Sequence, residues 1–284
     1  MTEIKGRAAF VTGAGSGIGQ GLAKALAAAG ATVAVADILL DNAQAVAEEI
    51  NTAGGKAVAI HCDVCERDSI KKAKAEANAA LGPISLLFAN AGVSNFDRLS
   101  EISDDTLDWI LQVNFMGVAY CMQAFLPDMV AARDGHVMAT ASTAGLFPTW
   151  IPMHSTYAAA KLGIVGLMLN IGMELAECNI GSTVYCPGGV TAKMKANMMR
   201  NRPARFGGPG GVEVNSEASF KNITLTFLTP DEVAPMVLRA IRNNRPIVLD
   251  HSDQRALFQK TYVDLVMGAF DDVAAYEREH AKPK

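Results

Sequence analysis

A tyrosine and a lysine lie four positions apart, at Tyr157 and Lys161, in a stretch whose pattern predicts a helix. Residues at this spacing share one face of a helix, so the phenol and the ammonium group lie on the same side. A neighbouring ammonium group favours the phenolate and lowers the pKa of a tyrosine from about 10 towards neutral pH. Such a tyrosine is suited to general acid–base catalysis. A chain of this composition contains one such pair by chance about one time in four, so the pair needs support from other residues.

Polar residues at three further places give that support. Ser142 follows a predicted strand and carries a hydroxyl group that can donate to a substrate oxygen. Asn90 follows another predicted strand, and Asn114 interrupts an otherwise apolar helical stretch, where a polar residue needs a reason. The carboxyl ends of parallel strands lie at one edge of a sheet, which is where ligands bind. We therefore expect these side chains to gather at one site.

A glycine-rich segment, Thr12-Gly13-Ala14-Gly15-Ser16-Gly17-Ile18-Gly19, follows the first predicted strand and opens a helix. Glycines permit a tight turn and let the backbone approach a pyrophosphate, which then meets the positive end of the helix. Glycine also serves plain helix–strand packing, but here the strand before and the helix after are both predicted. The segment therefore indicates a dinucleotide site.

Asp37 ends the second predicted strand, 18 positions after Gly19. A carboxylate there accepts hydrogen bonds from both ribose hydroxyl groups of NAD and repels the 2′-phosphate of NADP. The residues that follow, Ile38-Leu39-Leu40, are not basic, and Ser16 in the glycine turn is neutral. The sequence therefore predicts NAD, and the alternative is that Asp37 only caps a strand end.

Short apolar, β-branched runs alternate with longer alanine-rich stretches along most of the chain. Apolar strands separated by helices are typical of a parallel sheet covered on both faces, and right-handed crossovers make it a doubly wound α/β sheet, the Rossmann fold. Predicted strands lie at 7–12, 31–37, 56–62, 84–89, 136–141, 181–186 and 246–249. Predicted helices run from the glycine turn to 29 and over 41–52, 66–81, 104–133, 155–177 and 230–243.

We expect one domain over residues 1–284. The segment 191–229 breaks the alternation, contains a run rich in proline and glycine, and is too long for a bare connector. We interpret it as a substrate-binding lid. Residues 251–284 are predicted to form a polar, helical C-terminal extension.

The composition excludes several classes of protein. Half of the residues are hydrophobic and 19% are charged, which suits a chain with a sizeable core rather than a disordered one. The net charge is −4 and the basic residues are scattered, so we expect no nucleic-acid partner. No run of 18 uncharged apolar residues occurs, so we expect no membrane span. Five cysteines, an odd number, indicate reduced thiols and a cytoplasmic protein; Cys62 and Cys65 lack the partners of a metal site.

Five motifs in order make the chain resemble the short-chain dehydrogenase/reductase family, in its shorter single-domain branch. The motifs are Thr12 to Gly19, Asn90-Ala91-Gly92, Asn114, Ser142 with Tyr157 and Lys161, and Pro187-Gly188. The resemblance implies that Tyr157 exchanges a proton with the substrate and that Ser142 holds the substrate oxygen. It implies that Lys161 binds the nicotinamide ribose and lowers the pKa of Tyr157, and that Asn114 organises a water linked to Lys161.

The resemblance also implies a homotetramer or homodimer and a set of contacts to NAD. The predicted cofactor-binding residues are Gly13, Ser16, Gly17, Ile18, Gly19, Asp37, Asp63, Val64, Asn90, Ala91, Gly92, Tyr157, Lys161, Pro187, Gly188, Val190 and Thr191. The family usually places threonine five residues after the proline of its Pro-Gly motif, where this chain has Ala192 and, one position earlier, Thr191.

The spacing from Ser142 to Tyr157 is 15, about two longer than the family's usual spacing, and the surplus lies in the loop 147–154. We expect this loop and the lid to line the substrate site. The predicted substrate-binding residues are Phe147, Trp150, His154, Met194 and Met198. Residues 201–206 also resemble a lid segment of the aryl-ether Cα-dehydrogenases of lignin breakdown.

These features predict an oxidoreductase that moves a hydride between NAD and a secondary alcohol or ketone, of an apolar or aryl-bearing kind. Steroid, sugar and polyol alcohols stay open as substrates. One alternative is an NADPH-dependent carbonyl or ketoacyl reductase, against which Asp37 argues. An alternative from another class is a catalytically silent, cofactor-binding regulator.

Overall fold

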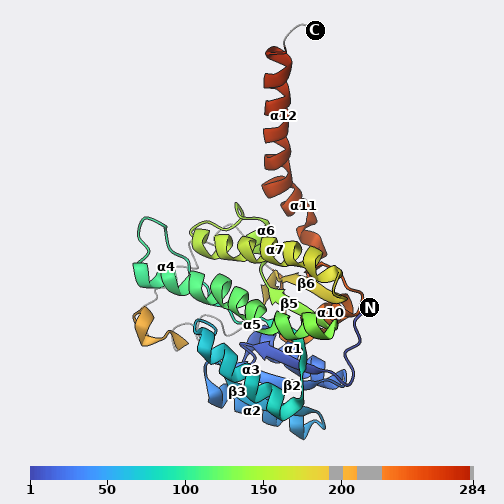
Figure 1. Cartoon of the computed structure of the whole chain (residues 1–284). Coiled ribbons are helices and arrows are strands. Elements are labelled where there is room, and N and C mark those ends of the chain that lie inside the picture. Colours follow the sequence, from blue (N-terminus) through green and yellow to red (C-terminus); the bar gives the residue numbers. More distant parts are fainter. Residues whose placement is uncertain (192–200, 210–225, 282–284) are drawn as a thin grey trace.

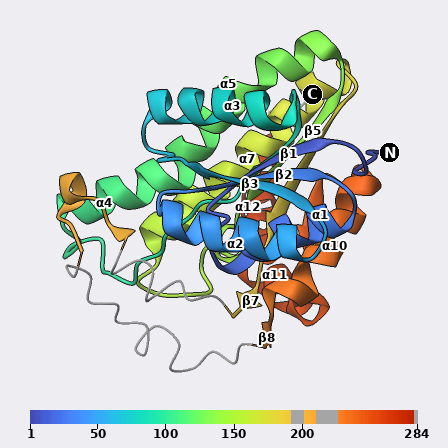
Figure 2. The same ribbon diagram turned by 90° about the horizontal axis from the view of Figure 1, so that it is seen from below.

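The protein, described here from a computed structural model over residues 1–191, 201–209 and 226–281, is built on a parallel sheet of seven strands. The strand order is β3-β2-β1-β4-β5-β6-β9. These strands are β1 (Ala8–Thr12), β2 (Thr32–Asp37), β3 (Lys56–His61), β4 (Ile84–Ala89), β5 (Gly135–Thr140), β6 (Ile180–Cys186) and β9 (Ile247–Leu249). Helices cover both faces (Figures 1 and 2), so the predicted doubly wound α/β fold is confirmed.

The two helical layers enclose two cores. The first layer consists of α1 (Gly17–Ala28), α2 (Leu40–Thr52) and α10 (Pro230–Arg242). The second layer consists of α3 (Arg67–Leu81), α5 (Gly117–Ala132) and α7 (Ser155–Ala176). Figure 2 shows these layers on opposite sides of the strands. Successive strand residues face opposite layers, as Phe10 and Val11 of β1 do, which is why the strands read as continuous apolar runs.

The order of the strands fixes the position of the site. β1 pairs with β2 on one side and with β4 on the other, so the chain reverses its direction across the sheet at β1. Ligands of open α/β sheets bind at this reversal, outside the carboxyl ends of the strands. The residues that follow β1, β2, β4 and β5 therefore meet at one place.

The predicted helix over 104–133 is interrupted. It consists of α4 (Asp104–Leu111), the π-helical turn η1 (Gln112–Met116) and α5, and Asn114 lies in the turn. The Asn114 side-chain amide donates to the carbonyl oxygen of Ile110, its own fourth-preceding residue, at 2.9 Å. That carbonyl would otherwise accept a backbone amide of an α-helix, so the side chain accounts for the local bulge.

Two helical stretches of the described chain, 104–132 and 155–176, are long and apolar enough to cross a membrane by length and composition. In the structure their buried side chains, such as Val118 and Ile164, belong to the core that packs on the sheet. Core helices of α/β proteins are apolar for this reason.

The remaining described elements lie around the carboxyl edge and at the C-terminus. They are the short helix α6 (Thr143–Leu146), the paired strands β7 (Gly189–Val190) and β8 (Phe227–Leu228), the 3₁₀ turns η2 (Ala204–Phe206) and η3 (Ser252–Gln254), and α11 (Arg255–Phe258), η4 (Gln259–Val263) and α12 (Asp264–Glu279). The C-terminal extension is helical, as predicted, but α12 also exposes several large apolar side chains. Parts of the expected lid, 192–200 and 210–225, lie outside the described residues.

Candidate active site

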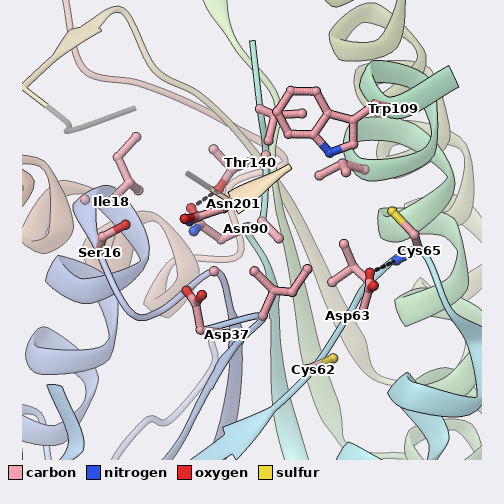
Figure 3. A pocket seen from close by; sticks show the side chains of 18 of the residues that line it. Ser16, Ile18, Asp37, Cys62, Asp63, Cys65, Asn90, Trp109, Thr140 and Asn201 are labelled. Atoms are coloured by element: carbon pink, nitrogen blue, oxygen red, sulfur yellow. Dashed lines mark hydrogen bonds between the residues drawn. The ribbon is translucent and has the colours of Figure 1, made fainter. Parts of the chain in front are cut away.

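A groove runs over the carboxyl ends of the central strands (Figure 3). Thirteen of the predicted cofactor-binding residues line it: Gly13, Ser16, Gly17, Ile18, Asp37, Asp63, Val64, Asn90, Ala91, Gly92, Tyr157, Lys161 and Pro187. They come from segments far apart in the sequence, which the reversal of the sheet at β1 brings together.

The glycine turn is too crowded for a side chain at Gly13 or Gly19. A Cβ atom at Gly13, where φ is +63°, would lie 2.8 Å from the Cα atom of Ala91. A Cβ atom at Gly19 would lie 2.2 Å from the carbonyl oxygen of Gly13, so Gly19 lies under the turn rather than on the wall of the groove. Ser16 caps the N-terminus of α1 without a side-chain cap bond, and it lines the groove. This backbone cradle at a helix N-terminus fits a pyrophosphate.

Asp37 lies at the end of β2 and is buried. Its two carboxylate oxygens accept one backbone amide each, from Gly15 at 2.9 Å and from Leu39 at 3.0 Å. The Ile38 amide also interacts with this carboxylate, which has about four lone-pair sites, so at least one stays available for a further donor. Burial raises the pKa of Asp37, and the backbone donors act in the opposite direction by favouring the carboxylate. The residue fits a ribose that offers two hydroxyl groups.

Asn90 connects three strands at the floor of the groove. Its side-chain amide donates to the carbonyl oxygen of Thr12 at 3.1 Å, and its side-chain oxygen accepts the Thr140 hydroxyl at 2.9 Å. The Thr12 hydroxyl accepts the backbone amides of Asn90 and Ala91. These bonds hold the ends of β1, β4 and β5 in register at the site.

Tyr157 and Lys161 lie on one face of α7, line the groove and are almost fully buried. The part of the groove around these two residues is called its chemical end below. The Lys161 ammonium nitrogen lies 5.5 Å from the centroid of the Tyr157 ring. Ser142 caps the N-terminus of α6, and its hydroxyl accepts the amide of Ala144 at 3.1 Å. A hydrogen bond between Ser142 and Tyr157 favours the phenolate.

The expected lowering of the Tyr157 pKa is not found in the structure. Burial raises the pKa of Tyr157 to about 12 and lowers the pKa of Lys161 to about 7. Burial disfavours the charged form of each group, so it opposes both the phenolate and the ammonium ion. At 5.5 Å from the ring, the ammonium group does not outweigh this penalty.

Asn114 is fully buried and all its described bonds go to the main chain. Besides the bond to Ile110, its amide donates to the carbonyl oxygen of Val93 at 2.9 Å and its oxygen accepts the amide of Val93 at 3.2 Å. A Cβ atom at Gly92 would lie 3.0 Å from this oxygen and 3.3 Å from the Lys161 nitrogen. Asn114 thus fixes the segment that passes Lys161.

The Pro187-Gly188 segment is held in place by Asp250, a residue near the C-terminus of the chain. The Gly188 amide donates to Asp250 at 2.9 Å, and the Tyr185 hydroxyl donates to the same carboxylate at 2.6 Å. Val190 and Thr191 do not line the groove, and Gly188 does not either. The Thr191 amide and hydroxyl both donate to the carbonyl oxygen of Leu228. In this arrangement the Thr191 side chain serves the pairing of β7 and β8.

The predicted substrate-binding residues are only partly placed. Phe147 is buried, and its ring packs on Trp150 and Phe258, so it belongs to a small aromatic core. His154 is buried between Phe96 and Tyr157, with ring centroids 4.4 and 4.3 Å away. Its Nδ1 atom lies 2.6 Å from the carbonyl oxygen of Asn95, and burial lowers its pKa to about 4. Met194 and Met198 lie outside the described residues.

Several groove residues are absent from the sequence-based prediction. They are Ile38, Cys62, Cys65, Val93, Trp109, Val113, Thr140, Ala141, Asn201 and Pro203. Figure 3 shows Trp109 and Cys65 on the side opposite Ser16 and Ile18. Two residues near Asn201 in the sequence contact groove residues. Arg205 donates to Asp63 at 2.7 Å, and the Arg202 guanidinium group lies over the Trp109 ring. Asn201 and Pro203 belong to the predicted lid, whereas no sequence motif marks the others, which reach the groove through tertiary packing.

Cys62 and Cys65 are free thiols on the groove wall. Burial raises the pKa of both, that of Cys65 to about 12, so neither is a thiolate at neutral pH. Among the residues that the structure describes, no group of three or more His, Cys, Asp or Glu is placed to hold a metal ion.

Comparisons with known proteins agree with this geometry. The family model for short chain dehydrogenase matches residues 7–203. The chain is 30% identical to the C alpha-dehydrogenase of Sphingobium sp. strain SYK-6 over 98% of this chain and 90% of that protein.

Two solved structures similar to this chain are complexes with cofactors. A short chain dehydrogenase/reductase from Burkholderia phymatum in complex with NAD has a TM-score of 0.85 and 27% identity, over 94% of this chain and 97% of its own. A metagenomic short-chain oxidoreductase in complex with NADP has a TM-score of 0.69 and 27% identity, over 88% of this chain and 98% of its own. A nicotinamide cofactor is therefore common to both neighbours.

Proposed function

This chain belongs to the short-chain dehydrogenase family, and we propose that it uses NAD to oxidise a secondary alcohol to a ketone. As a member of the family it is an oxidoreductase that acts on CH–OH groups. The observation that carries the proposal is that Tyr157 and Lys161, beside Ser142, line the same groove as Asp37 and the glycine turn. The groove thus has a residue set for acid–base chemistry and a separate set for a dinucleotide.

We propose that Tyr157, which its raised pKa keeps as a neutral phenol, passes its own proton on towards the neutral amine of Lys161 as it accepts the proton of the alcohol hydroxyl group. The C–H bond of the carbinol carbon breaks in the same step, and its electron pair leaves with the hydride. The nicotinamide ring, when bound, supplies the acceptor for the hydride that leaves this carbon. Ser142 holds the substrate oxygen next to the Tyr157 hydroxyl. In the reverse direction Tyr157 donates the same proton to the carbonyl oxygen.

Lys161 is suited to carry this proton onward. Its pKa of about 7 lets it gain and lose a proton near neutral pH, and its bond to the Thr140 carbonyl oxygen holds it in the groove. We propose that Lys161 also binds the ribose beside the nicotinamide. Asn114 holds the neighbouring segment in place and orders a water that connects Lys161 to solvent.

The preference for NAD rests on charge. Among the described residues that line the groove, the one cationic side chain is Lys161, which belongs to the chemical end. Asp37 keeps acceptor capacity for a ribose hydroxyl group and has a charge that repels a 2′-phosphate. We therefore propose NAD rather than NADP.

For the substrate we propose an apolar, aryl-bearing secondary alcohol. The similarity to the C alpha-dehydrogenase supports this class because it spans 98% of the chain. We further propose one domain that acts in the cytoplasm, in keeping with its five free thiols, as a homodimer or homotetramer.

The experiment is to follow absorbance at the NADH band with purified protein, NAD or NADP, and aryl, steroid, polyol and aliphatic secondary alcohols. We expect turnover with NAD and the aryl members. Equal turnover with NADP would remove the cofactor proposal, and turnover of carbonyls with NADPH alone would favour a reductase. Tight NAD binding with no turnover of any alcohol or carbonyl would favour a regulator.

A further inference from the structure

The C-terminal helix α12 projects away from the sheet and its covering helices (Figure 1). None of its residues is buried. Its large apolar side chains are between 41% and 66% exposed: Leu265, Val266, Met267, Phe270, Val273 and Tyr276. Isolated helices of roughly 12–15 residues are marginal in water, and most helices owe their stability to a packed apolar face. α12 therefore lacks the packing partner that a helix of this kind needs.

The segment from Tyr262 to the end of α12, called the arm below, has apolar residues at the spacing found in helices that pack on another surface. Spacings of four and three residues separate Tyr262, Val266, Ala269, Val273 and Tyr276. Residues at this 3.5-residue period form a single seam along a helix and pack against another protein surface. Phe270 and Leu265 flank the seam and widen it, whereas Asp264 and Asp271 lie on the opposite face.

The residues that precede α12 contact the rest of the chain at the loop before Tyr157. The Phe258 ring lies 5.7 Å from the Phe147 ring, and the Thr149 hydroxyl donates to the carbonyl oxygen of Thr261 at 2.8 Å. The Tyr262 ring stacks on Phe258 at 6.1 Å. These contacts fix how α12 projects from the rest of the chain. The apolar seam therefore has a defined orientation relative to the sheet.

We propose that the apolar seam of α12 packs against a second copy of this chain. In this dimer each copy receives the α12 helix of the other, an arrangement called arm exchange below. A two-fold exchange covers both seams at once. The exposed apolar side chains of two arms amount to on the order of 1,000 Å², which is enough for a specific interface once the receiving surfaces are added. The body also exposes apolar side chains, including Met173 at 75% and Leu169 at 38% on α7, so a second copy offers apolar surface.

The charges of the arm argue against a lipid surface as the partner. Amphipathic helices that lie on membranes carry lysine and arginine on their polar face. α12 carries five carboxylates against one basic residue, Arg278, and the face opposite the seam includes Asp264 and Asp271. Anionic lipids would repel this face, whereas a protein surface of the same chain needs no basic residues for an apolar contact.

The test is light scattering with size-exclusion chromatography of the full chain over a range of concentrations. The comparison is with Phe270→Glu, with a chain that ends at residue 263, and with Ala275→Glu, which adds the same charge on the other face of α12. We expect self-association of the full chain and of Ala275→Glu, and at least tenfold weaker association of the other two. A monomeric full chain, or equal association of Phe270→Glu and Ala275→Glu, would overturn the proposal.

A second measurement identifies the occupant directly and does not depend on enzymatic activity. A photoreactive amino acid replaces Phe270 in isotopically labelled chains, which are then mixed with unlabelled chains and irradiated. We expect cross-linked peptides that join labelled arms to unlabelled bodies. Cross-links confined to one chain, or none to this chain, would exclude the exchange. Cooperative thermal unfolding shows that each variant is folded without reference to NAD, so failure here and failure of the proposed function are separate results.

Discussion

The Lys161 ammonium group donates a hydrogen bond of 2.8 Å to the carbonyl oxygen of Thr140, the last residue of β5. The Thr140 hydroxyl in turn donates to Asn90 at the end of β4. Thr140, at the end of β5, thus bonds to both Lys161 and Asn90. The position of Lys161 is determined by the sheet, although its ammonium group is buried at a cost.

That cost predicts a pH-dependent effect of Lys161→Met on stability. The folded-state pKa is about 7, against about 10.4 for an exposed lysine. Between these values the unfolded chain binds more protons at this residue, so stability rises with pH; below about pH 7 the folded protein carries the full penalty of the buried charge. We expect Lys161→Met to raise the melting temperature more at pH 6 than at pH 9.

The measurement for this prediction is thermal unfolding at both pH values. Lys72→Met, at a lysine whose side chain is 81% exposed, is the control and should show the same small effect at both. If the gain from Lys161→Met were equal at pH 6 and pH 9, Lys161 would not have a lowered pKa.

Asp37→Asn should change the choice of cofactor. The amide has nearly the same shape but lacks the charge, and only one of its two polar atoms can accept the amide of Gly15 or Leu39. We expect about tenfold or greater loss of NAD affinity, in line with the loss of charged hydrogen bonds, and a smaller preference for NAD over NADP. Calorimetric titration of both cofactors measures this. Asp41→Asn, at an exposed residue of α2, should leave both affinities unchanged; an unchanged preference in Asp37→Asn would remove its assigned role.

Asn114→Ala should destabilise the fold as well as the site. It removes three bonds to the main chain, so the partly buried Val93 amide and the buried Ile110 carbonyl oxygen both lose this partner. Each such group costs about 1–3 kcal/mol. Urea unfolding should therefore show a loss at the upper end of single substitutions. Asn51→Ala is a matched control, because the exposed Asn51 also makes two main-chain bonds, to Ala57. An equal loss for both variants would mean that burial of Asn114 contributes nothing.

The sequence predicts the sheet well because each strand is a short, mostly apolar run, and a glycine, asparagine, aspartate or serine lies at its end or within two positions after it. Asp37, Asn90 and Ser142 mark strand ends, and strand ends in a parallel sheet converge on the ligand site. The order of elements and the main groove residues therefore follow from local patterns.

Other features depend on contacts that no local pattern records. The π-helical bulge at Asn114 arises because its side-chain amide replaces a backbone donor at the Ile110 carbonyl oxygen. The sequence shows only a polar residue in an apolar run, which does not specify this bond. The two-residue strands β7 and β8 pair over a long separation, and Asp250 reaches Gly188 across 62 positions. Burial also decides the pKa of Tyr157, and the spacing of Tyr157 and Lys161 alone leads to the opposite expectation.

The central claim is that Tyr157 moves the proton while other residues bind the cofactor. The most direct test measures NADH formation from an aryl secondary alcohol by Tyr157→Phe and by Tyr120→Phe, a half-buried tyrosine on α5, together with NAD affinity. General acid–base groups contribute about 10²–10⁴-fold, so we expect Tyr157→Phe to lose at least about 100-fold in kcat with NAD affinity nearly unchanged. Tyr120→Phe should retain full activity. Undiminished turnover by Tyr157→Phe would contradict the account.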